Sequence, residues 1–139
     1  TRKRKENFNV LYNIFEKYNK YFILPKATRK SDVNWFAFSL TIRDECPFKR
    51  NDICTYLEKN LIQTRTMFGG CLVFQPGYKN VKWMDYSLME NIGSNNAKEL
   101  FPVATKVTTD CFFLGCSPVI TTEQLDYVKE IVDEFFKSL

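Results

Sequence analysis

The chain has 139 residues, of which 45% are hydrophobic and 16% are aromatic. That is the length of one ordinary domain with enough apolar side chains for a core, so the composition excludes a disordered chain. A domain near this size buries roughly 68–70% of its unfolded surface, and it therefore needs neither disulfides nor a structural metal.

The positive charge is concentrated at the amino end of the sequence. There are 20 Lys and Arg against 16 Asp and Glu, a net charge of +4, and the run Arg2–Lys5 contributes four of the basic residues. A nucleic-acid-binding domain usually spreads its excess charge over a folded face. We therefore expect a solvated terminus and no nucleic-acid partner. The alternative, nucleic-acid binding through this run, predicts strongly salt-dependent association.

Histidine is absent, and the five cysteines are odd in number and lack a C-x-x-C pair. The lack of histidine removes the commonest general base and the commonest metal ligand. The cysteine pattern favours reduced thiols in a cytoplasmic protein. No segment approaches the roughly 20 consecutive apolar residues of a membrane span, and the start lacks the apolar core of a signal peptide. We expect a soluble cytoplasmic protein with no metal site and no membrane partner.

The first 66 residues predict a helix, a strand, a second helix and a second extended segment. Apolar residues recur at threes and fours over Lys3–Tyr21, which is typical of an amphipathic helix. Asn34–Ile42 is rich in aromatic and branched residues and predicts a strand. Helical spacing returns over Arg50–Asn60, with Asn51 available as a cap. Leu61–Thr66 then resumes an extended pattern.

Glycine and proline punctuate the middle of the chain. Phe68, Gly69 and Gly70 predict a turn, since paired glycines adopt backbone conformations that bulky residues avoid. From there to Asn96 the sequence predicts mostly loop, with a short helix over Trp83–Leu88.

The last third predicts a helix, a strand and a terminal helix. Pro102 suits the first turn of a helix over Pro102–Thr109, and a compact strand follows over Cys111–Leu114. Thr121 or Thr122 caps the terminal helix, and Gln124 is placed to complete a capping box from Thr121.

Three strands separated by helices and irregular segments indicate an α+β two-layer domain, with one sheet packed under helices. The first helix begins at the first residues with no preceding strand or cap of its own. We therefore expect it to be a connector from a larger protein.

The strongest ligand-binding candidate is Arg65, which stands near a predicted strand end, immediately before the glycine turn. A planar guanidinium matches phosphate or carboxylate oxygens, and ligand groups gather at such positions. The alternative is an arginine on a solvated strand edge. Gly69 and Gly70 would let a backbone approach a ligand, but without a GKS or G-x-G-x-x-G context they equally form a plain turn.

The aromatic run and the acidic residues have simpler structural interpretations. The aromatic residues of Trp35–Phe38 predict core packing rather than a ring-binding surface. Asp44, Glu45 and Asp52 flank a predicted helix start, where carboxylates interact favourably with the helix dipole. We prefer this interpretation to an acid/base pair.

Three of the cysteines flank the predicted last strand or follow the glycine turn, namely Cys71, Cys111 and Cys116. Small buried thiols are the more ordinary interpretation than iron–sulfur ligands. These interpretations leave no catalytic residue and no metal ligand in the chain.

Four segments, in order along the chain, resemble one known family. Ile62–Pro76, IQTRTMFGGCLVFQP, is similar to its TR-hydrophobic-hydrophobic-F-small-G-N…QP segment. Asn34–Phe38 resembles its S-W-F-G-F strand, Cys111–Gly115 its FFIGVYPGLT segment, and Leu125–Val128 the start of its last helix. The family is that of the sugar 3-dehydratases of deoxysugar and lipopolysaccharide O-antigen biosynthesis, which belong to the DegT-type sugar aminotransferases.

The resemblance implies the α+β carboxy-terminal small domain of a fold type I enzyme dependent on pyridoxal phosphate (PLP) or pyridoxamine phosphate (PMP), with a small, mostly antiparallel sheet covered by helices. It implies that residues 1–30 are an interdomain connector helix and linker, and that residues 31–139 are the small domain. PLP or PMP would be bound mainly by the large domain, which also carries the histidine that replaces the usual lysine. We therefore expect this chain alone to be inactive and the full-length enzyme to be a homodimer.

The implied substrate is a nucleotide-linked 4-keto-6-deoxy sugar, which loses its C3 hydroxyl while the cofactor acts as electron sink. Carried over to this sequence, Arg65 is the substrate-facing group. Phe68, Gly69 and Gly70 shape the turn beside it, and Gln75 is a further substrate-binding residue.

The sequence departs from the family pattern at Cys71, where the motif has asparagine, and at Ser117, Val119 and Ile120. One branch of the family holds an iron–sulfur cluster with four cysteines that include a C-x-C pair. This sequence has no C-x-C, so we expect no iron–sulfur cluster. The alternative to an enzyme domain is a non-catalytic α+β module that recognises a ligand or a protein through Arg65 and the aromatic residues.

Overall fold

The computed structural model describes residues 2–72, 75–78 and 97–139. In chain order its elements are α1 (Arg2–Glu16), β1 (Phe22–Ile23), β2 (Ala37–Ile42), α2 (Arg50–Lys59), β3 (Thr64–Thr66), the 3-10 turn η2 (Pro76–Tyr78), α4 (Ala97–Leu100), α5 (Pro102–Asp110), β4 (Cys111–Gly115) and α6 (Thr122–Lys137).

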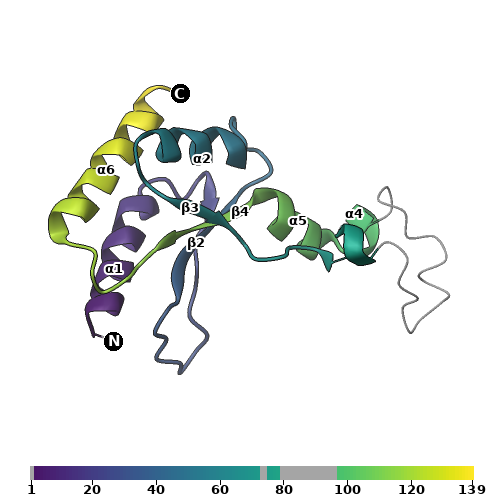
Figure 1. Ribbon diagram of the computed structural model, residues 1–139, viewed down its shortest axis with the longest axis horizontal. Helices are drawn as coiled ribbons and strands as arrows, with labels where there is room; N and C mark the ends of the chain where they lie inside the picture. Colours follow the sequence, from purple (N-terminus) through teal and green to yellow (C-terminus); the bar gives the residue numbers. More distant parts are fainter. Residues whose placement is uncertain (1, 73–74, 79–96) are drawn as a thin grey trace.

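The four strands form one antiparallel sheet in the order β1-β2-β4-β3. Helices α1 and α6 lie side by side, α2 lies near the carboxy-terminal half of α6, and α5 extends away from them, as Figure 1 shows. The predicted α+β architecture with a small antiparallel sheet is therefore confirmed.

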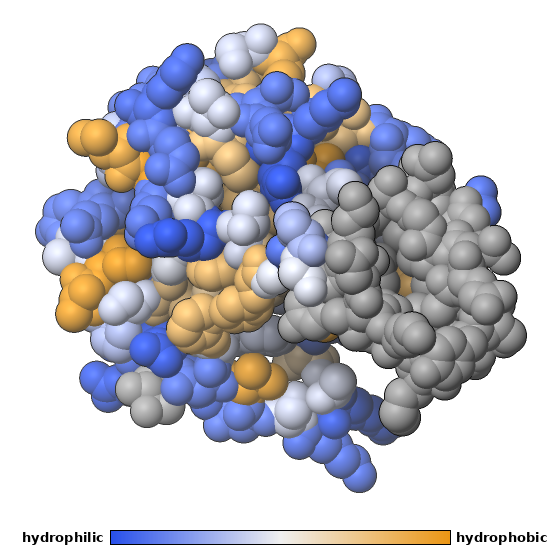
Figure 2. Space-filling view, turned by 45° about the vertical axis from the view of Figure 1, so that its right-hand side comes forward, coloured by the Kyte–Doolittle hydropathy of each residue, from blue (hydrophilic) through white to orange (hydrophobic). Residues whose placement is uncertain are grey.

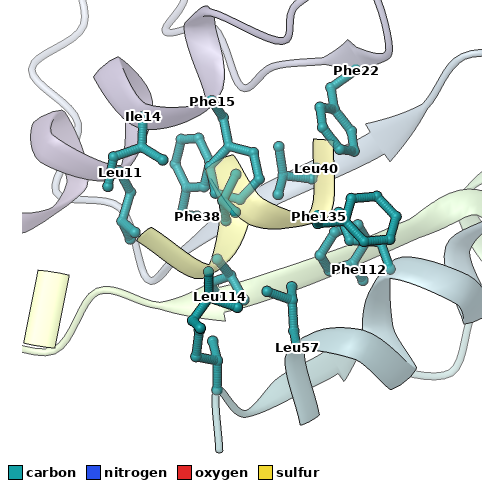
Figure 3. Packing of buried hydrophobic residues seen from close by; sticks show 14 of the residues in the cluster. Leu11, Ile14, Phe15, Phe22, Phe38, Leu40, Leu57, Phe112, Leu114 and Phe135 are labelled. Carbon is teal, nitrogen blue, oxygen red and sulfur yellow. The ribbon is translucent and has the colours of Figure 1, made fainter. Parts of the chain in front are cut away.

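The core lies on one face of this sheet. Burial alternates along β2, where Phe38, Leu40 and Ile42 are buried and the residues between them are half-buried. Figure 3 shows Phe38 and Leu40 meeting side chains of α1 and α6, and the ring centroid of Phe38 lies 5.6 Å from that of Phe15. The alternation follows from the two-residue period of a strand, so the neighbouring residues point to the opposite face.

The first helix is shorter than its apolar pattern predicts. It ends at Glu16, and Phe22 pairs with Ile42 as the start of an edge strand. The Arg43 Nε donates to the Asn19 and Phe22 carbonyls at 3.0 and 3.1 Å. These contacts, which come from a residue far along the sequence, hold the connecting turn, so the prediction of helix as far as Tyr21 is wrong.

The start of α2 also differs from the prediction. The Asp52 carboxylate accepts a hydrogen bond from the Lys49 amide at 2.8 Å, so Lys49 is the capping position and the prediction of Asn51 is wrong. The predicted capping box of α6 is confirmed. The Gln124 side chain accepts from the Thr121 amide at 2.9 Å, and the Thr121 hydroxyl accepts from the Gln124 amide at 3.3 Å.

The later elements agree closely with expectation. The strand predicted at Cys111–Leu114 and the helix predicted at Pro102–Thr109 each extend by one residue, so α5 runs into β4 with no residue between them. The helix at Ala97–Leu100 was not expected. The predicted short helix over Trp83–Leu88 lies outside the described residues.

Asn7 fastens the first helix to the segment that follows β4. Its side chain is fully buried, and its Nδ2 donates to the Ser117 carbonyl at 2.7 Å and to the Ile120 carbonyl at 3.2 Å. Two half-buried residues thereby have their carbonyl oxygens satisfied. The contact joins positions more than 100 residues apart in sequence.

We expect Asn7→Ala to lower the free energy of unfolding by about 2 kcal/mol, because it removes both hydrogen bonds and leaves two carbonyls without their partner. Urea unfolding followed by circular dichroism measures this. Asn13→Ala, at an exposed position of the same helix, should change the value by less than about 0.5 kcal/mol. Equal effects of the two substitutions would show that the Asn7 contacts contribute nothing.

Candidate functional site

Arg65 lies at the centre of β3, an edge strand, and its side chain is exposed. It stands directly opposite Phe113 of β4, which in turn stands opposite Ser39 of β2. Directly opposed residues in a sheet share a face, and the neighbours of Phe113 are the buried Phe112 and Leu114. Arg65 therefore projects from the face opposite the core.

Aromatic rings continue this face beyond Arg65. Phe36 and Phe68 are 70% and 75% exposed, and their ring centroids lie 6.2 Å apart. Each also lies 6.0 Å from the ring of the half-buried Phe113. Figure 2 shows an area of hydrophobic surface near the middle of the view, with hydrophilic residues around it. Two exposed phenylalanines around Phe113, the cross-strand partner of Arg65, offer a ligand both ring contact and charge.

The prediction that the aromatic residues of Trp35–Phe38 are core is therefore wrong for Phe36. Phe38 is fully buried, and Trp35 is half-buried and stacks on Phe8 with centroids 5.1 Å apart. Phe36 precedes the first residue of β2 and turns to the other face, where Phe68 and Phe113 are its neighbours. No feature of the sequence pattern distinguishes it from Phe38.

The predicted glycine turn is present, and its two glycines are not equivalent. Gly70 has φ +62°, and a Cβ there would lie 2.6 Å from the Thr108 Oγ1. A Cβ at Gly69 would meet only a side-chain carbon of Leu72 at 3.9 Å. Phe68 also has positive φ, +42°, a conformation uncommon for a bulky residue. Backbone geometry thus requires glycine at position 70 alone.

Gln75, the fifth predicted site residue, is joined to this turn. Its Nε2 donates to the Gly69 carbonyl, and its amide donates to the Leu72 carbonyl at 2.9 Å. The structure therefore brings Arg65, Phe68, Gly69, Gly70 and Gln75 together at one end of β3. The side-chain nitrogen of Gln75 is engaged within the turn, so its side-chain oxygen, Oε1, is the group left for a ligand.

Thr108 of α5 is a contact of this turn that the sequence analysis did not identify. Its hydroxyl accepts from the Cys71 amide at 2.6 Å and donates to the Ala104 carbonyl at 2.7 Å. The Cys71 side chain is buried, so its backbone amide makes the polar contact at the position where the family motif has asparagine. A threonine inside a helix gives no sequence signal for this role.

Glu58 of α2 accepts hydrogen bonds from the first residue of β3. One of its carboxylate oxygens accepts from the Thr64 amide at 2.6 Å and from the Thr64 hydroxyl at 2.8 Å. These hydrogen bonds, together with the positive charge of Arg65, lower the pKa of Glu58 below its ordinary value. The bonds to Thr64 hold the strand residue next to Arg65 in place.

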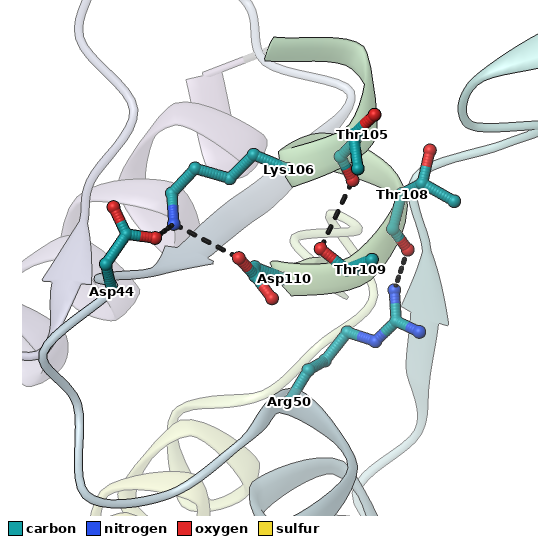
Figure 4. A network of polar contacts seen from close by, with 7 residues as sticks. All are labelled: Asp44, Arg50, Thr105, Lys106, Thr108, Thr109 and Asp110. Carbon is teal, nitrogen blue, oxygen red and sulfur yellow. Dashed lines mark hydrogen bonds and ion pairs between the residues drawn. The ribbon is translucent and has the colours of Figure 1, made fainter. Parts of the chain in front are cut away.

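Helix α5 is fixed by a network of polar contacts that Figure 4 shows. Lys106 pairs with Asp44 from the segment after β2, and with Asp110 at 3.1 Å. Arg50, the first residue of α2, donates to the carbonyls of Thr108 and Cys111, the latter at 3.3 Å. The interpretation of the acidic residues as partners of a helix start is confirmed for Asp52, whereas Asp44 pairs with Lys106 of α5 instead.

A hollow of about 680 Å³ lies elsewhere, between the start of β3 and the first half of α6. Its lining is mainly apolar and includes Leu11, Leu61 and Val128. None of the five predicted site residues lines it, and it lacks a charged group matched to a phosphate or carboxylate. We therefore place the candidate site at Arg65 and the turn.

Lys106 is paired with the carboxylates of Asp44 and Asp110, and the chain has no histidine. In the described part, no three His, Cys, Asp or Glu residues are grouped to hold a metal ion. Cys71, Cys111 and Cys116 are free and buried, which confirms their interpretation as small core thiols.

Within residues 2–72, 75–78 and 97–139, none of the helices combines the length and the apolar character that crossing a membrane requires.

Comparison with known proteins relates the chain to one aminotransferase family and to two curated proteins. The profile of the DegT/DnrJ/EryC1/StrS aminotransferase family matches residues 1–133. The lipopolysaccharide biosynthesis protein RfbH of Salmonella typhimurium is 32% identical over 133 residues, which cover 96% of this chain and 28% of RfbH. A dTDP-4-dehydro-2,6-dideoxy-D-glucose 3-dehydratase of Saccharopolyspora spinosa is 33% identical over 113 residues, 81% of this chain and 22% of that enzyme.

Solved structures show the same fold at low sequence identity. An aminotransferase from Psychrobacter cryohalolentis superposes with a TM-score of 0.79 at 14% identity, over 99% of this chain and 34% of that one. The E. coli GDP-4-keto-6-deoxy-D-mannose-3-dehydratase with bound hydrated PLP gives a TM-score of 0.62 at 18% identity, over 93% of this chain and 30% of that one. The chain thus spans about a third or less of each of these proteins.

We expect Gly70→Ala to lower the free energy of unfolding by at least about 1 kcal/mol, because a Cβ at positive φ is strained and would press on Thr108. Gly69→Ala should cost less than about 0.5 kcal/mol. Urea unfolding of both variants checks the difference, and a Gly70→Ala protein as stable as Gly69→Ala would contradict the described turn.

Proposed function

Because the chain belongs to the DegT/DnrJ/EryC1/StrS aminotransferase family, we propose that it is the carboxy-terminal small domain of a PLP- or PMP-dependent nucleotide-sugar 3-dehydratase. The reaction is C3 deoxygenation of a nucleotide-linked 4-keto-6-deoxy hexose in O-antigen or lipopolysaccharide biosynthesis. The two curated relatives support this choice, since one is named for lipopolysaccharide biosynthesis and the other for 3-dehydration.

The observation that carries the proposal is the exposed Arg65 on the sheet face opposite the core, with the rings of Phe36 and Phe68 around its cross-strand partner Phe113. No hydrogen bond joins its guanidinium to another of the described residues. Such a guanidinium is suited to a bidentate contact, in which it donates two hydrogen bonds to an anionic group of the substrate.

The cofactor in this proposal is held by residues outside the chain and supplies the electron sink for loss of the C3 hydroxyl. The present residues bind and orient the sugar nucleotide: Arg65 by charge, Phe68 by ring contact, and Gly69 and Gly70 by the shape of the turn. The remaining carbonyl oxygen of Gln75 is a further acceptor for a sugar hydroxyl.

The organisation of the full-length enzyme follows from the same proposal. Residues 1–30 would be the connector helix and linker and 31–139 the small domain of a cytoplasmic homodimer without an iron–sulfur cluster. Packing of Leu11, Ile14 and Phe15 into the sheet core would then fix the direction of the connector relative to the small domain.

In the full-length enzyme, Arg65→Ala should raise KM for the nucleotide-linked 4-keto-6-deoxy sugar by about ten- to a hundredfold, the range for loss of a charged hydrogen bond. Arg65→Lys should recover part of the affinity, because it keeps the charge and loses the planar fork. Arg2→Ala, at an exposed position of α1, is the control. Steady-state kinetics measures all three, and an unchanged KM for Arg65→Ala would remove Arg65 from the site.

The 139-residue chain alone should not bind PLP, because the proposal assigns the cofactor site to the large domain of the full-length enzyme, whereas a polypeptide that includes this domain should bind PLP. Absorbance titration with PLP distinguishes the two. Binding of PLP by the chain alone at micromolar concentration would contradict the assignment of the cofactor site to the large domain. The non-catalytic alternative, a ligand- or protein-binding module, is favoured if the natural reading frame carries no cofactor-binding domain before this chain.

A further inference from the structure

We propose that Thr108 is a positioning residue for the substrate-facing surface of Arg65 and Phe68, a role that rests on the proposed function of that surface. Thr108 belongs to α5 and lies far in sequence from both residues. It acts through the turn Phe68–Cys71, which follows β3 directly.

The Thr108 hydroxyl uses both its donor and its acceptor capacity. It donates to the Ala104 carbonyl at 2.7 Å, which fixes the orientation of the hydroxyl hydrogen. With the hydrogen so placed, a lone pair accepts the Cys71 amide at 2.6 Å. Since the Cys71 side chain is buried, loss of this acceptor leaves a backbone amide without a partner in a poorly hydrated place.

The same side chain limits the turn sterically. A Cβ on Gly70 would lie 2.6 Å from the Thr108 Oγ1 and 3.0 Å from its Cγ2. The turn thus lies in close contact with Thr108 at Gly70 and is hydrogen-bonded to it at Cys71. Phe68, two residues earlier, is held at φ +42° with its ring exposed.

Thr108 is itself held rigidly with respect to the sheet. Its carbonyl accepts from Arg50, and Lys106 two residues earlier pairs with Asp44 and Asp110. Helix α5 also continues into β4 without a connecting residue, and β4 carries Phe113 opposite Arg65. Thr108 therefore transmits the position of α5 and β4 to the turn that carries Phe68.

Thr109 offers a matched control. Its hydroxyl also donates to a carbonyl four residues earlier, that of Thr105, at 3.2 Å. It has no hydrogen bond to the Phe68–Cys71 turn. Thr108→Val and Thr109→Val remove the same group from adjacent positions of one helix, and Thr108→Ser keeps the hydroxyl that the proposal requires.

The experiment compares these three variants in the full-length enzyme. Hydrogen–deuterium exchange of the Cys71 amide reports the contact, and steady-state kinetics with the nucleotide-linked 4-keto-6-deoxy sugar reports its consequence. We expect Thr108→Val to speed exchange at Cys71 and to raise KM about three- to tenfold, the contribution of one neutral hydrogen bond, with little change in kcat. Thr108→Ser should restore both values, and Thr109→Val should alter neither.

Three outcomes would overturn the proposal. Unchanged exchange at Cys71 in Thr108→Val would show that the hydroxyl does not hold the turn. Faster exchange with an unchanged KM, while Arg65→Ala raises KM, would show that the turn is held but does not position the substrate; the proposed function would then stand alone. An unchanged KM in Arg65→Ala refutes the substrate contact itself, and the positioning role with it.

Discussion

The antiparallel pairing of β4 with both β2 and β3 is the constraint on which the site depends. Because β4 is central, the register that places Phe113 opposite Arg65 also places Phe112 and Leu114 in the core. Burial of these side chains therefore fixes, through the two-residue period of the strand, which residues reach the outer face. The hydrophobic core and the candidate binding surface are two consequences of the same set of backbone hydrogen bonds.

The core and helix α5 are held by different kinds of contact. The core face of the sheet is packed with phenylalanine and aliphatic side chains from α1, α2 and α6. Helix α5, which leads directly into β4, is held by directional polar contacts of Arg50, Lys106 and Thr108. Packed apolar side chains provide most of the stability of such a domain, whereas directional contacts specify position more than they stabilise. That division suits a surface that has to be placed accurately yet remain open to a ligand.

Local sequence signals predicted the elements whose stability is local. The capping box of Thr121 and Gln124, the helix that begins at Pro102 and the glycine turn were all recognisable. The end of the first helix was not, because contacts of Arg43 from another part of the chain decide it. For the site, strand-end position and the family motif identified Arg65 and its neighbours. Phe36 and Thr108 were missed, since an aromatic near a strand and a threonine in a helix acquire their roles only from tertiary neighbours.

Helix α5 continues directly into β4, so no connecting residue can absorb a change of length between the helix and the strand. One extra residue at that junction would rotate every following side chain of the strand to the other side, so Phe113 would face inward and Phe112 outward. The long segment between β1 and β2 has no such restriction. A change of length is therefore tolerated better there than between Thr108 and Phe113, where the number of residues decides which side chains reach the core.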